Sequence, residues 1–479
     1  MKEVKLYING QWKETVSGEI KEDYNPSDNS IYAKVHMAGE QEVEEALQAA
    51  YDAREMWKNT TASTRERILL KAADWMEENI QEVADVLMGE SGSARKKAFF
   101  EAGFAIDIFR AAAGECRRVF GEIQHQNPGE MSMIHHLPLG VVAGIAPFNF
   151  PIVLALKKVA FAIAAGNTFV LKPASATPVS GAIIVKALEA GGLPAGVFNL
   201  VPGSGSTVGN KLIEDKRTAM VAFTGSTGVG RDIAKKAAPL FKKYTLELGG
   251  KSPMILLKDF DVDQAVKIAG FGAFFHQGQI CMCNSRIIVE EAIYHEFCEK
   301  LTAYAKKLKI GNAYEEDTDI GPLIDVKQCD FIDKQIQNAL DKGARLMTGG
   351  KHEGSYYEPT VLADVTNEMD IFFDESFGPV TSVIKAKDPE EALKICNDNK
   401  YGLSSSLLTN DISKAMELSL KMEAGMVHIN GATVNDNSTV AFGGVKESGV
   451  GREGGQYSIE EFTEKKWITV KYKPFELPF

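Results

Sequence analysis

The stretch from Val141 to Lys172 decides the fold, and it reads VVAGIAPFNFPIVLALKKVAFAIAAGNTFVLK. Short runs of small and β-branched residues at 141–146 and 168–172 predict strands, and the longer apolar run at 152–165 predicts a helix between them. The alternation continues with a helix at 179–190, strands at 197–201 and 220–224, and a helix at 228–238. Strands that alternate with helices indicate an α/β fold with a parallel sheet covered on both faces.

Residues 139–156 are almost uncharged, and the segment is long enough to raise the question of a membrane span. It contains Pro147, Asn149 and Pro151, which are unfavourable in a helix that crosses lipid. A buried strand, a loop and the start of a helix account for the segment better. We therefore expect no membrane partner.

The rest of the chain carries further helix and strand patterns. Upstream, residues 4–12 predict a short hairpin, and residues 41–57 and 64–88 predict helices. A second α/β block begins at about residue 249, and no Pro- or Ser-rich linker separates it from the first. Its predicted elements are a helix that starts near Cys281, a strand at 285–290 and a helix near 293–308.

Two segments have the pattern of strands that pair outside their own domain. Residues 120–137 form two strand-like runs around Asn127-Pro128-Gly129. In the tail, Ile468 and Val470 alternate with polar residues, and Tyr472 continues the pattern. An exposed alternating strand invites unwanted pairing, so either a neighbouring subunit covers it or it is an ordinary edge strand of the monomer.

Composition and charge exclude several classes of function. The chain has 479 residues, 44% of them hydrophobic and 25% charged, as in ordinary soluble enzymes. A net charge of −12 disfavours nucleic acid and anionic membranes as partners, because both require a basic surface. The first residues lack the apolar core of a secretion signal. We expect a cytoplasmic enzyme.

The six cysteines are scattered, which favours reduced thiols over a disulfide framework. Cys281 and Cys283, with His276 nearby, match no common zinc spacing. We therefore expect no metal. Cys283 is read as a small neighbour of Cys281 that is open to oxidative side reactions.

Three segments contain the side chains that covalent catalysis on a carbonyl requires. Cys281 lies in QGQICMCNSR (277–286), Glu247 in LELGGKSP (246–253) and Asn149 in PFNFP (147–151). They offer a thiol nucleophile, a carboxylate base and an amide donor for an oxyanion. Each has an ordinary alternative: an inert buried thiol, a solvated surface charge, and a cap of the helix after Pro151.

All three segments resemble the signatures of the aldehyde dehydrogenase superfamily, and the likeness extends over nearly the whole chain. The resemblance implies that Cys281 attacks the aldehyde carbon to give a thiohemiacetal, which loses hydride to NAD or NADP and becomes a thioester. Glu247 then activates the water that hydrolyses the thioester. The side chain of Asn149 and the backbone N–H of Cys281 stabilise the oxyanion.

Lys158 and Glu453 match family positions associated with proton transfer away from Glu247. The assignment of Lys158 is weaker than that of Cys281, because Lys157 adjoins it and either lysine could be a surface charge.

The resemblance also implies three structural parts. Residues 1–118 and 139–248 form an NAD(P)-binding domain with a Rossmann-like parallel sheet, and residues 249–449 form an α/β catalytic domain. Residues 119–138 and 450–479 form a small β arm for oligomerisation, which implies a homodimer or a homotetramer.

Two glycine-rich clusters follow predicted strands, VPGSGSTVG (201–209) and FTGSTGVG (223–230). Neither is the GxGxxG of an ordinary dinucleotide fold, and each could be only a tight turn. The second opens a predicted helix, whose free N–H groups and dipole suit a pyrophosphate. The resemblance implies cofactor contacts from Ile145, Pro147, Phe148, Lys172, Ser175, Gly205, Gly209, Phe223, Gly225, Ser226, Gly230, Leu248, Glu375 and Phe377.

Ser175 bears on the choice of cofactor. NAD-preferring relatives often carry Glu at this position, where it accepts from the ribose 2′-hydroxyl and repels a 2′-phosphate. Ser175 is short and uncharged and Lys172 is nearby, so we expect NADP to be used beside or ahead of NAD. Glu375 and Phe377 match the pair that holds the nicotinamide ribose, although Ser376 stands where an aliphatic residue is usual.

The substrate is an aldehyde, and its class rests on weaker signals. His276 stands where many relatives carry Asn, and Ile280 and Met282 flank the nucleophile. With Phe148 and Phe275 they suggest an apolar mouth. Residues 121–134 and 276–282 resemble the benzaldehyde and vanillin dehydrogenase branch. An aromatic aldehyde is therefore our expectation, with short aliphatic aldehydes and semialdehydes as alternatives.

Three other classes are alternatives to this function. A coenzyme A-acylating dehydrogenase has no need of a water-activating base, so Glu247 argues against it. A non-catalytic descendant has no reason to keep Cys281, Glu247 and Asn149 together. A phosphate-dependent dehydrogenase would need a different base, usually His, and only His276 offers one.

Overall fold

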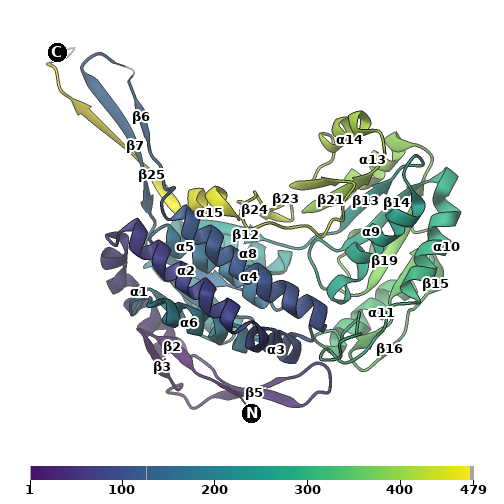
Figure 1. Cartoon of the computed structure of the whole chain (residues 1–479), viewed down its shortest axis with the longest axis horizontal. Coiled ribbons are helices and arrows are strands. Elements are labelled where there is room, and N and C mark those ends of the chain that lie inside the picture. Colours follow the sequence, from purple (N-terminus) through teal and green to yellow (C-terminus); the bar gives the residue numbers. More distant parts are fainter. Residues whose placement is uncertain (1, 126, 475–478) are drawn as a thin grey trace.

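A computed structural model describes residues 2–125, 127–474 and 479 of the chain. Two large, mainly parallel sheets form the body of the molecule, and an arm of three strands extends away from it (Figure 1). The predicted α/β class with parallel sheets is confirmed.

The first sheet has eight strands. Its order is β24 (Gly449–Val450), β12 (Lys243–Glu247), β11 (Thr218–Thr224), β8 (Val141–Ile145), β9 (Thr168–Lys172), β10 (Phe198–Leu200), β2 (Leu6–Ile8) and β3 (Gln11–Lys13). The strands from β12 to β10 are parallel to one another, while β24 and β2 pair antiparallel to them. The hairpin of β2 and β3 is the one predicted at residues 4–12.

Helices cover both faces of this sheet because successive side chains of its strands point to opposite sides. In β8, Val141 and Ala143 belong to the core under α1 (Glu40–Lys58), whereas Val142 belongs to the core on the other face. The helices of that other core are α2 (Ala62–Glu78), α3 (Ile80–Ser91), α4 (Arg95–Glu115), α5 (Pro151–Ala164) and α6 (Pro178–Gly191). A further helix, α8 (Thr227–Ala237), packs on β12.

The single helix predicted at 64–88 is wrong, because α2 and α3 are separate helices. They meet at Asn79, whose backbone leaves the helical region (φ −111°, ψ 23°). The Asn79 side chain donates to the carbonyl of Trp75 at 2.8 Å. Asn side chains compete with the helical backbone in this way, which makes Asn a frequent break point.

The segment 139–156 is a strand, a loop and the start of a helix, as predicted. β8 ends at Ile145, and α5 begins with Pro151 at its first position, where the missing N–H costs nothing. Every residue of α5 is buried in protein. Among the described residues, no helix has both the length and the apolar character that a membrane crossing needs.

The second sheet has seven strands. Its order is β15 (Arg345–Thr348), β18 (Thr360–Ala363), β19 (Val380–Ala386), β14 (Asn284–Glu290), β13 (Ser252–Leu256), β21 (Ser404–Leu408) and β22 (Met426–Ile429). All neighbours are parallel except β15 and β18. Helices again cover both faces: α9 (Val262–Phe274) and α10 (Tyr294–Ala305) on one, α11 (Val326–Asp341), α13 (Pro389–Asn397) and α14 (Ile412–Ser419) on the other.

Cys281 does not start a helix, contrary to the prediction. It lies in a turn between a short 3-10 segment, η3 (Phe275–Gly278), and strand β14. Helix α9 ends at Phe274, and the backbone of Phe275 leaves the helical region (ψ 134°). His276 and Gln277 then adopt left-handed backbone angles, with φ of 51° and 55°. His, like Asn, is enriched in this region of backbone space, so His276 can adopt this conformation.

The arm consists of β6 (Glu122–Gln124), β7 (Glu130–Pro138) and β25 (Thr463–Lys471), all antiparallel. Its two predicted segments therefore pair with each other, from Thr463 opposite Pro138 to Lys471 opposite Glu130. The arm projects from the body of the molecule (Figure 1). Large apolar side chains on it are exposed to solvent, among them Trp467 at 70% exposure. Residues 475–478 of the predicted arm lie outside the described residues.

The remaining elements are short. One small sheet contains β1 (Lys2–Val4), β5 (Ile31–His36) and β4 (Ile20–Tyr24). Two strand pairs are β16 (His352–Glu353) with β17 (Tyr356–Tyr357), and β20 (Tyr401–Gly402) with β23 (Val445–Lys446). The short helices are α7 (Asn210–Glu214), α12 (Asp370–Phe373) and α15 (Gly455–Glu461).

Candidate active site

Buried amides fix the turn that carries Cys281. The amide nitrogen of Gln277 donates to the carbonyls of Gly92 (3.0 Å) and Pro322 (2.9 Å). The amide oxygen of Gln279 accepts from the backbone N–H of Ile324 at 3.0 Å. These bonds tie the turn to segments remote in sequence, so Cys281 is held by tertiary contacts.

Asn149 lies in the loop between β8 and α5, and its side chain is buried. Its amide nitrogen donates to the carbonyl oxygen of Gln279 at 2.8 Å, and Asn149 and Cys281 line the same cavity. The residue before α5 is Phe150, and no side chain caps this helix. The alternative in which Asn149 is only a helix cap is therefore wrong.

A buried ion pair lies beneath the Asn149 loop. Lys97 of α4 donates to Glu101 (2.5 Å) and to the backbone carbonyl of Asn149 (2.7 Å). Glu101 in turn accepts the backbone N–H groups of Ile152 and Val153 in the first turn of α5 (3.0 and 3.2 Å). Helix α4 thereby holds both ends of the segment that positions the Asn149 amide.

Glu247 is the last residue of β12 and is only 3% exposed. Neither of its carboxylate oxygens has a hydrogen-bond partner among the described residues. Burial raises the pKa of Glu247 well above its usual value, and the negative charge of Glu453 raises it further. The positive charges of Lys158, Lys157 and Arg452 oppose this rise. A carboxylate with a raised pKa is suited to accept a proton near neutral pH.

Lys158 and Glu453 meet beside Glu247. The ammonium of Lys158 donates to Glu453 and to the hydroxyl of Thr224, each at 2.6 Å. Lys157 is equally buried and pairs with Asp436 at 2.5 Å. The alternative that either lysine is a surface charge is wrong, because both are completely buried. Consecutive helical residues point about 100° apart, and here each lysine meets its own acid.

The Glu247 segment lies directly against Cys281. A Cβ on Gly250 would come within 2.2 Å of the Cys281 carbonyl oxygen, so only glycine permits this approach. Burial raises the pKa of the Cys281 thiol, and the charges of Glu375, Glu247 and Asp436 raise it further. The resting thiol is therefore neutral and needs a base to become a thiolate.

The predicted cofactor residues of the first sheet lie at the carboxyl ends of its strands. Ile145 ends β8, Lys172 ends β9, and Phe223 stands next to the end of β11. The sheet continues from β8 to β9 on one side and to β11 on the other, which makes this the point where ligands bind in α/β folds. Pro147 and Phe148 follow in the loop after β8.

The two glycine clusters lie at the same edge. The first forms a single π-helical turn, η1 (Gly205–Gly209), after β10. In the second, Ser226 caps α8, and its hydroxyl accepts a backbone N–H of the first turn at 3.5 Å. Gly225 donates its N–H to the Glu247 carbonyl at 3.0 Å. A Cβ on Gly230 would lie 2.5 Å from Leu248, so glycine lets Leu248 pack against α8.

Lys172 and Ser175 lie beyond the end of β9. Burial lowers the pKa of Lys172 to about 8, helped by the positive charge of Lys21. Lys172 donates to the carbonyl of Pro173 at 3.1 Å. Ser175 is exposed.

Residues near the second sheet complete this region. Glu375 accepts the N–H of Gly250 at 3.1 Å, and burial raises its pKa to about 7. Phe377 has a left-handed backbone (φ 49°), which is a costly conformation for a bulky residue. Its ring packs edge-on against the ring of Phe148, with 5.7 Å between the ring centroids. The unusual Ser376 accepts from the buried ammonium of Lys251 at 3.3 Å, which gives this serine a partner that an aliphatic residue would lack.

A cavity of about 220 Å³ opens beside Cys281. Its lining is mainly aromatic and aliphatic: Phe100, Phe104, Asn149, Phe150, Val153, Leu154, Phe271, Phe275, Ile280, Cys281, Met282, Val434, Asn435, Asp436 and Phe442. Phe100 and Phe271 are exposed and mark the outer end of the cavity. The predicted apolar mouth is thus present around Ile280, Met282 and Phe275.

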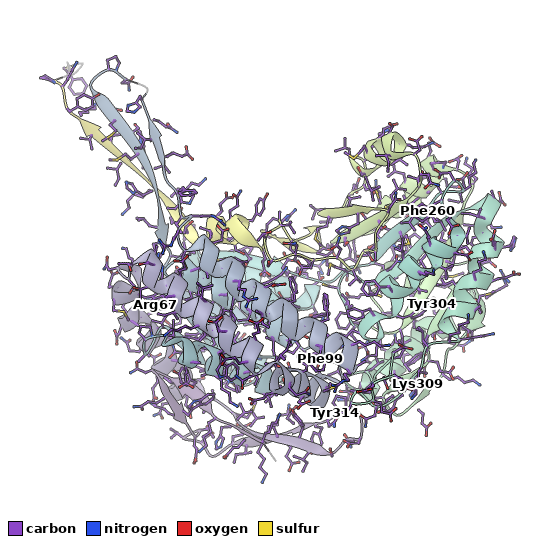
Figure 2. All side chains as sticks on the ribbon, viewed as in Figure 1. Arg67, Phe99, Phe260, Tyr304, Lys309 and Tyr314 are labelled. Carbon is purple, nitrogen blue, oxygen red and sulfur yellow. The ribbon has the colours of Figure 1, made fainter. Side chains whose placement is uncertain are left out.

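Two predicted residues of the mouth do not line this cavity. Phe148 turns toward Phe377 instead. His276 is buried and lines a second cavity of about 230 Å³ instead. Lys97 and Tyr304 also line this cavity, and Tyr304 is labelled in Figure 2. The His276 ring packs edge-on against Phe150, with 5.5 Å between the ring centroids.

The sequence reasoning missed several residues of the site. Lys97 and Glu101 are four residues apart on α4, so the spacing that pairs them was available. Asp436 stands between two asparagines and carries no signal of burial in the sequence. The aromatic lining from α4 and α9 follows from packing between elements that no local pattern connects.

Comparison with known proteins bears on this site. The sequence matches the aldehyde dehydrogenase family over residues 12–468. It is 41% identical to vanillin dehydrogenase of Corynebacterium glutamicum, over 98% of this chain and 97% of that protein. The fold matches the crystal structure of salicylaldehyde dehydrogenase from Pseudomonas putida G7 complexed with salicylaldehyde, with TM-score 0.98, 37% identity and full coverage of both chains.

A betaine aldehyde dehydrogenase from Staphylococcus aureus, solved in complex with NAD+, is also similar. Its TM-score is 0.96 at 33% identity, with 99% of this chain and 95% of that chain covered.

Proposed function

Because the chain belongs to the aldehyde dehydrogenase family, we propose that it oxidises an aromatic aldehyde to the carboxylic acid with NAD or NADP, through a thioester on Cys281. One observation carries the proposal. Cys281 and Asn149 border one apolar cavity, and the buried, unpartnered carboxylate of Glu247 stands in the segment that touches the Cys281 backbone.

The first step is attack of the Cys281 sulfur on the aldehyde carbon. The neutral thiol loses its proton before the attack, because the thiolate is the nucleophile. The new bond joins Sγ to the carbonyl carbon, and the carbonyl oxygen becomes an oxyanion. The Asn149 amide and the Cys281 backbone N–H are the donors that stabilise it.

The second step turns the thiohemiacetal into a thioester on Cys281. A bound nicotinamide would supply the acceptor for the hydride, and so for both electrons, that the substrate carbon loses in this step. The site offers groups that fit such a cofactor: the N-terminus of α8 with its helix dipole, the Phe148 and Phe377 rings, and the Glu375 carboxyl.

The third step is hydrolysis. Glu247 takes a proton from water, the resulting hydroxide attacks the thioester carbon, and the Cys281 sulfur leaves as thiolate. The ion pair of Lys158 and Glu453 borders Glu247 and offers the route by which that proton leaves. A water-activating carboxylate favours release of the free acid over transfer to coenzyme A.

The mainly apolar cavity supports an aromatic aldehyde as substrate, since aromatic rings offer both shape and favourable edge-to-face contacts. The similarity to vanillin and salicylaldehyde dehydrogenases supports the same class. The exposed, uncharged Ser175 next to Lys172 supports acceptance of the NADP 2′-phosphate.

We extend the proposal to the organisation of the protein. Residues 1–118 and 139–248 are the cofactor domain, residues 249–449 the catalytic domain, and 119–138 with 450–479 the oligomerisation arm. The exposed Trp467 on the arm supports a homodimer or homotetramer, because a large apolar surface on a projecting strand is a poor free edge. The free state of all six cysteines supports a reducing compartment, the cytoplasm.

The test is the initial rate of nicotinamide reduction with benzaldehyde, with NADP and NAD compared at equal concentrations. Reduction that depends on benzaldehyde, with benzoate as product and no need for coenzyme A, supports the proposal. Faster reduction of NAD than of NADP would overturn the argument from Ser175. Oxidation of aliphatic aldehydes without oxidation of benzaldehyde would overturn the aromatic assignment.

A further inference from the structure

The aldehyde cavity contains one acidic side chain among the described residues that line it. Asp436 enters the wall between Asn435 and the ring of Phe442, and the rest of the lining is apolar apart from two amides and the thiol of Cys281. The Asp436 side chain is 13% exposed. A carboxylate in an apolar wall is costly without a partner or a task.

Its partner is Lys157 of α5. The Lys157 ammonium lies 2.5 Å from one Asp436 oxygen and 2.6 Å from the other, and it is completely buried. It lies 3.9 Å from the centre of the Phe442 ring, a favourable cation–π distance. The backbone N–H of Asn437 adds a donor to one Asp436 oxygen at 2.7 Å.

This arrangement leaves the Asp436 carboxylate, and not the Lys157 ammonium, in the lining of the cavity. Lys157 is completely buried and does not line the cavity, whereas its partner Asp436 does. A carboxylate has about four lone-pair sites, and the donors around Asp436 fill three of them. The remaining capacity suits a neutral hydroxyl donor and repels a second anion.

We propose that Asp436, held in place by Lys157, is a specificity-determining residue. It selects aromatic aldehydes that bear a ring hydroxyl and rejects aldehydes that bear an anionic group of their own. The inference rests on the proposed function, since it concerns the same aldehyde cavity. It adds a chemical criterion that the apolar walls alone do not supply.

The test compares five substrates: benzaldehyde, 3- and 4-hydroxybenzaldehyde, and 3- and 4-carboxybenzaldehyde. We expect kcat/KM for at least one hydroxybenzaldehyde to exceed that for benzaldehyde by about tenfold, as one hydrogen bond to a charged group would give. In Asp436→Asn that preference should fall, and kcat/KM for the carboxybenzaldehydes should rise relative to benzaldehyde.

Substrate ratios within one variant remove a confounding effect. The charge of Asp436 also raises the pKa of the Cys281 thiol, so the substitution changes the rate with every aldehyde, and the ratio cancels that change. Asp330→Asn, on the exposed face of α11, is the matched control and should leave all ratios unchanged.

A second variant guards against misfolding. Asp436→Asn leaves the buried Lys157 ammonium without an acidic partner, which destabilises the fold. The double variant Asp436→Asn with Lys157→Met removes both charges and avoids this unpaired charge. It should show the same loss of preference.

Ratios in either variant that equal those of the unaltered enzyme would overturn the inference and leave the proposed function intact. If the unaltered enzyme oxidises none of these aldehydes, the proposed aromatic function fails instead.

Discussion

Lys157 and Lys158 are neighbours on α5, yet they serve two separate buried regions. Lys158 joins Glu453 beside Glu247, where a proton must be accepted and passed on. Lys157 joins Asp436 in the wall of the aldehyde cavity. The helix directs the two ammonium groups to different sides. One helix thereby supports the chemistry on one side and substrate choice on the other, and substitutions should separate the two effects.

The largest effect is expected when the Cys281 sulfur, on which both regions act, is removed. Cys281→Ala should lower turnover by at least about four powers of ten, because no other group can form the thioester. The variant should still bind the cofactor, and nicotinamide fluorescence measures this binding. Substantial turnover in this variant would contradict the assignment of the nucleophile, and Cys283→Ala, expected to stay active, is the matched control.

Glu247→Gln should act on the Lys158 side alone. Loss of the base should reduce steady-state turnover with benzaldehyde by about three powers of ten, within the range for general-base catalysis. The substrate ratios governed by Asp436 should hardly move, since Glu247 does not line the aldehyde cavity. Steady-state rates with benzaldehyde and hydroxybenzaldehyde measure both quantities. A large change in the ratio of these two rates would contradict the claim that Glu247 has no part in substrate choice.

Asn149→Ala should lower kcat by about two powers of ten, the usual cost of one oxyanion donor. KM should change little, because the donor acts mainly on the transition state. The kinetic constants for benzaldehyde check this prediction. A rise in KM with kcat unchanged would instead make Asn149 a substrate-binding residue.

The smallest effects are shifts in the pH profile. Glu247 must be deprotonated to act, so turnover should rise as pH passes upward through its raised pKa. Glu453→Gln removes a charge that raises this pKa and should move the profile to lower pH. Lys158→Met removes a charge that lowers it and should move the profile to higher pH, and Lys157→Met should do so less, because its influence is smaller.

Turnover at saturating benzaldehyde, measured across pH for the three variants, tests these signs. Equal shifts in the same direction for Glu453→Gln and Lys158→Met would contradict the account of Glu247. A larger shift of the pH profile in Lys157→Met than in Lys158→Met would contradict the claim that Lys158 is the lysine that acts mainly on Glu247.

The sequence predicted the parts of the site that lie in continuous segments. The strand, loop and helix around Asn149 and the separate segments of Glu247 and Cys281 could be located because local residue types carry their signal. Asn79 was missed as a helix break because the residues on both sides keep a helical pattern. Asp436 was missed because its burial depends on Lys157 and Phe442, which reach it from distant parts of the chain.

Acylation of Cys281 is the central claim, and mass spectrometry of Glu247→Gln tests it most directly. The variant is mixed with benzaldehyde and NADP or NAD, quenched in acid and digested. We predict one benzoyl group in place of a hydrogen on the peptide of Cys281, with one equivalent of reduced cofactor formed per active site. A peptide without the benzoyl group despite cofactor reduction, or a benzoyl group on Cys283, would contradict the account.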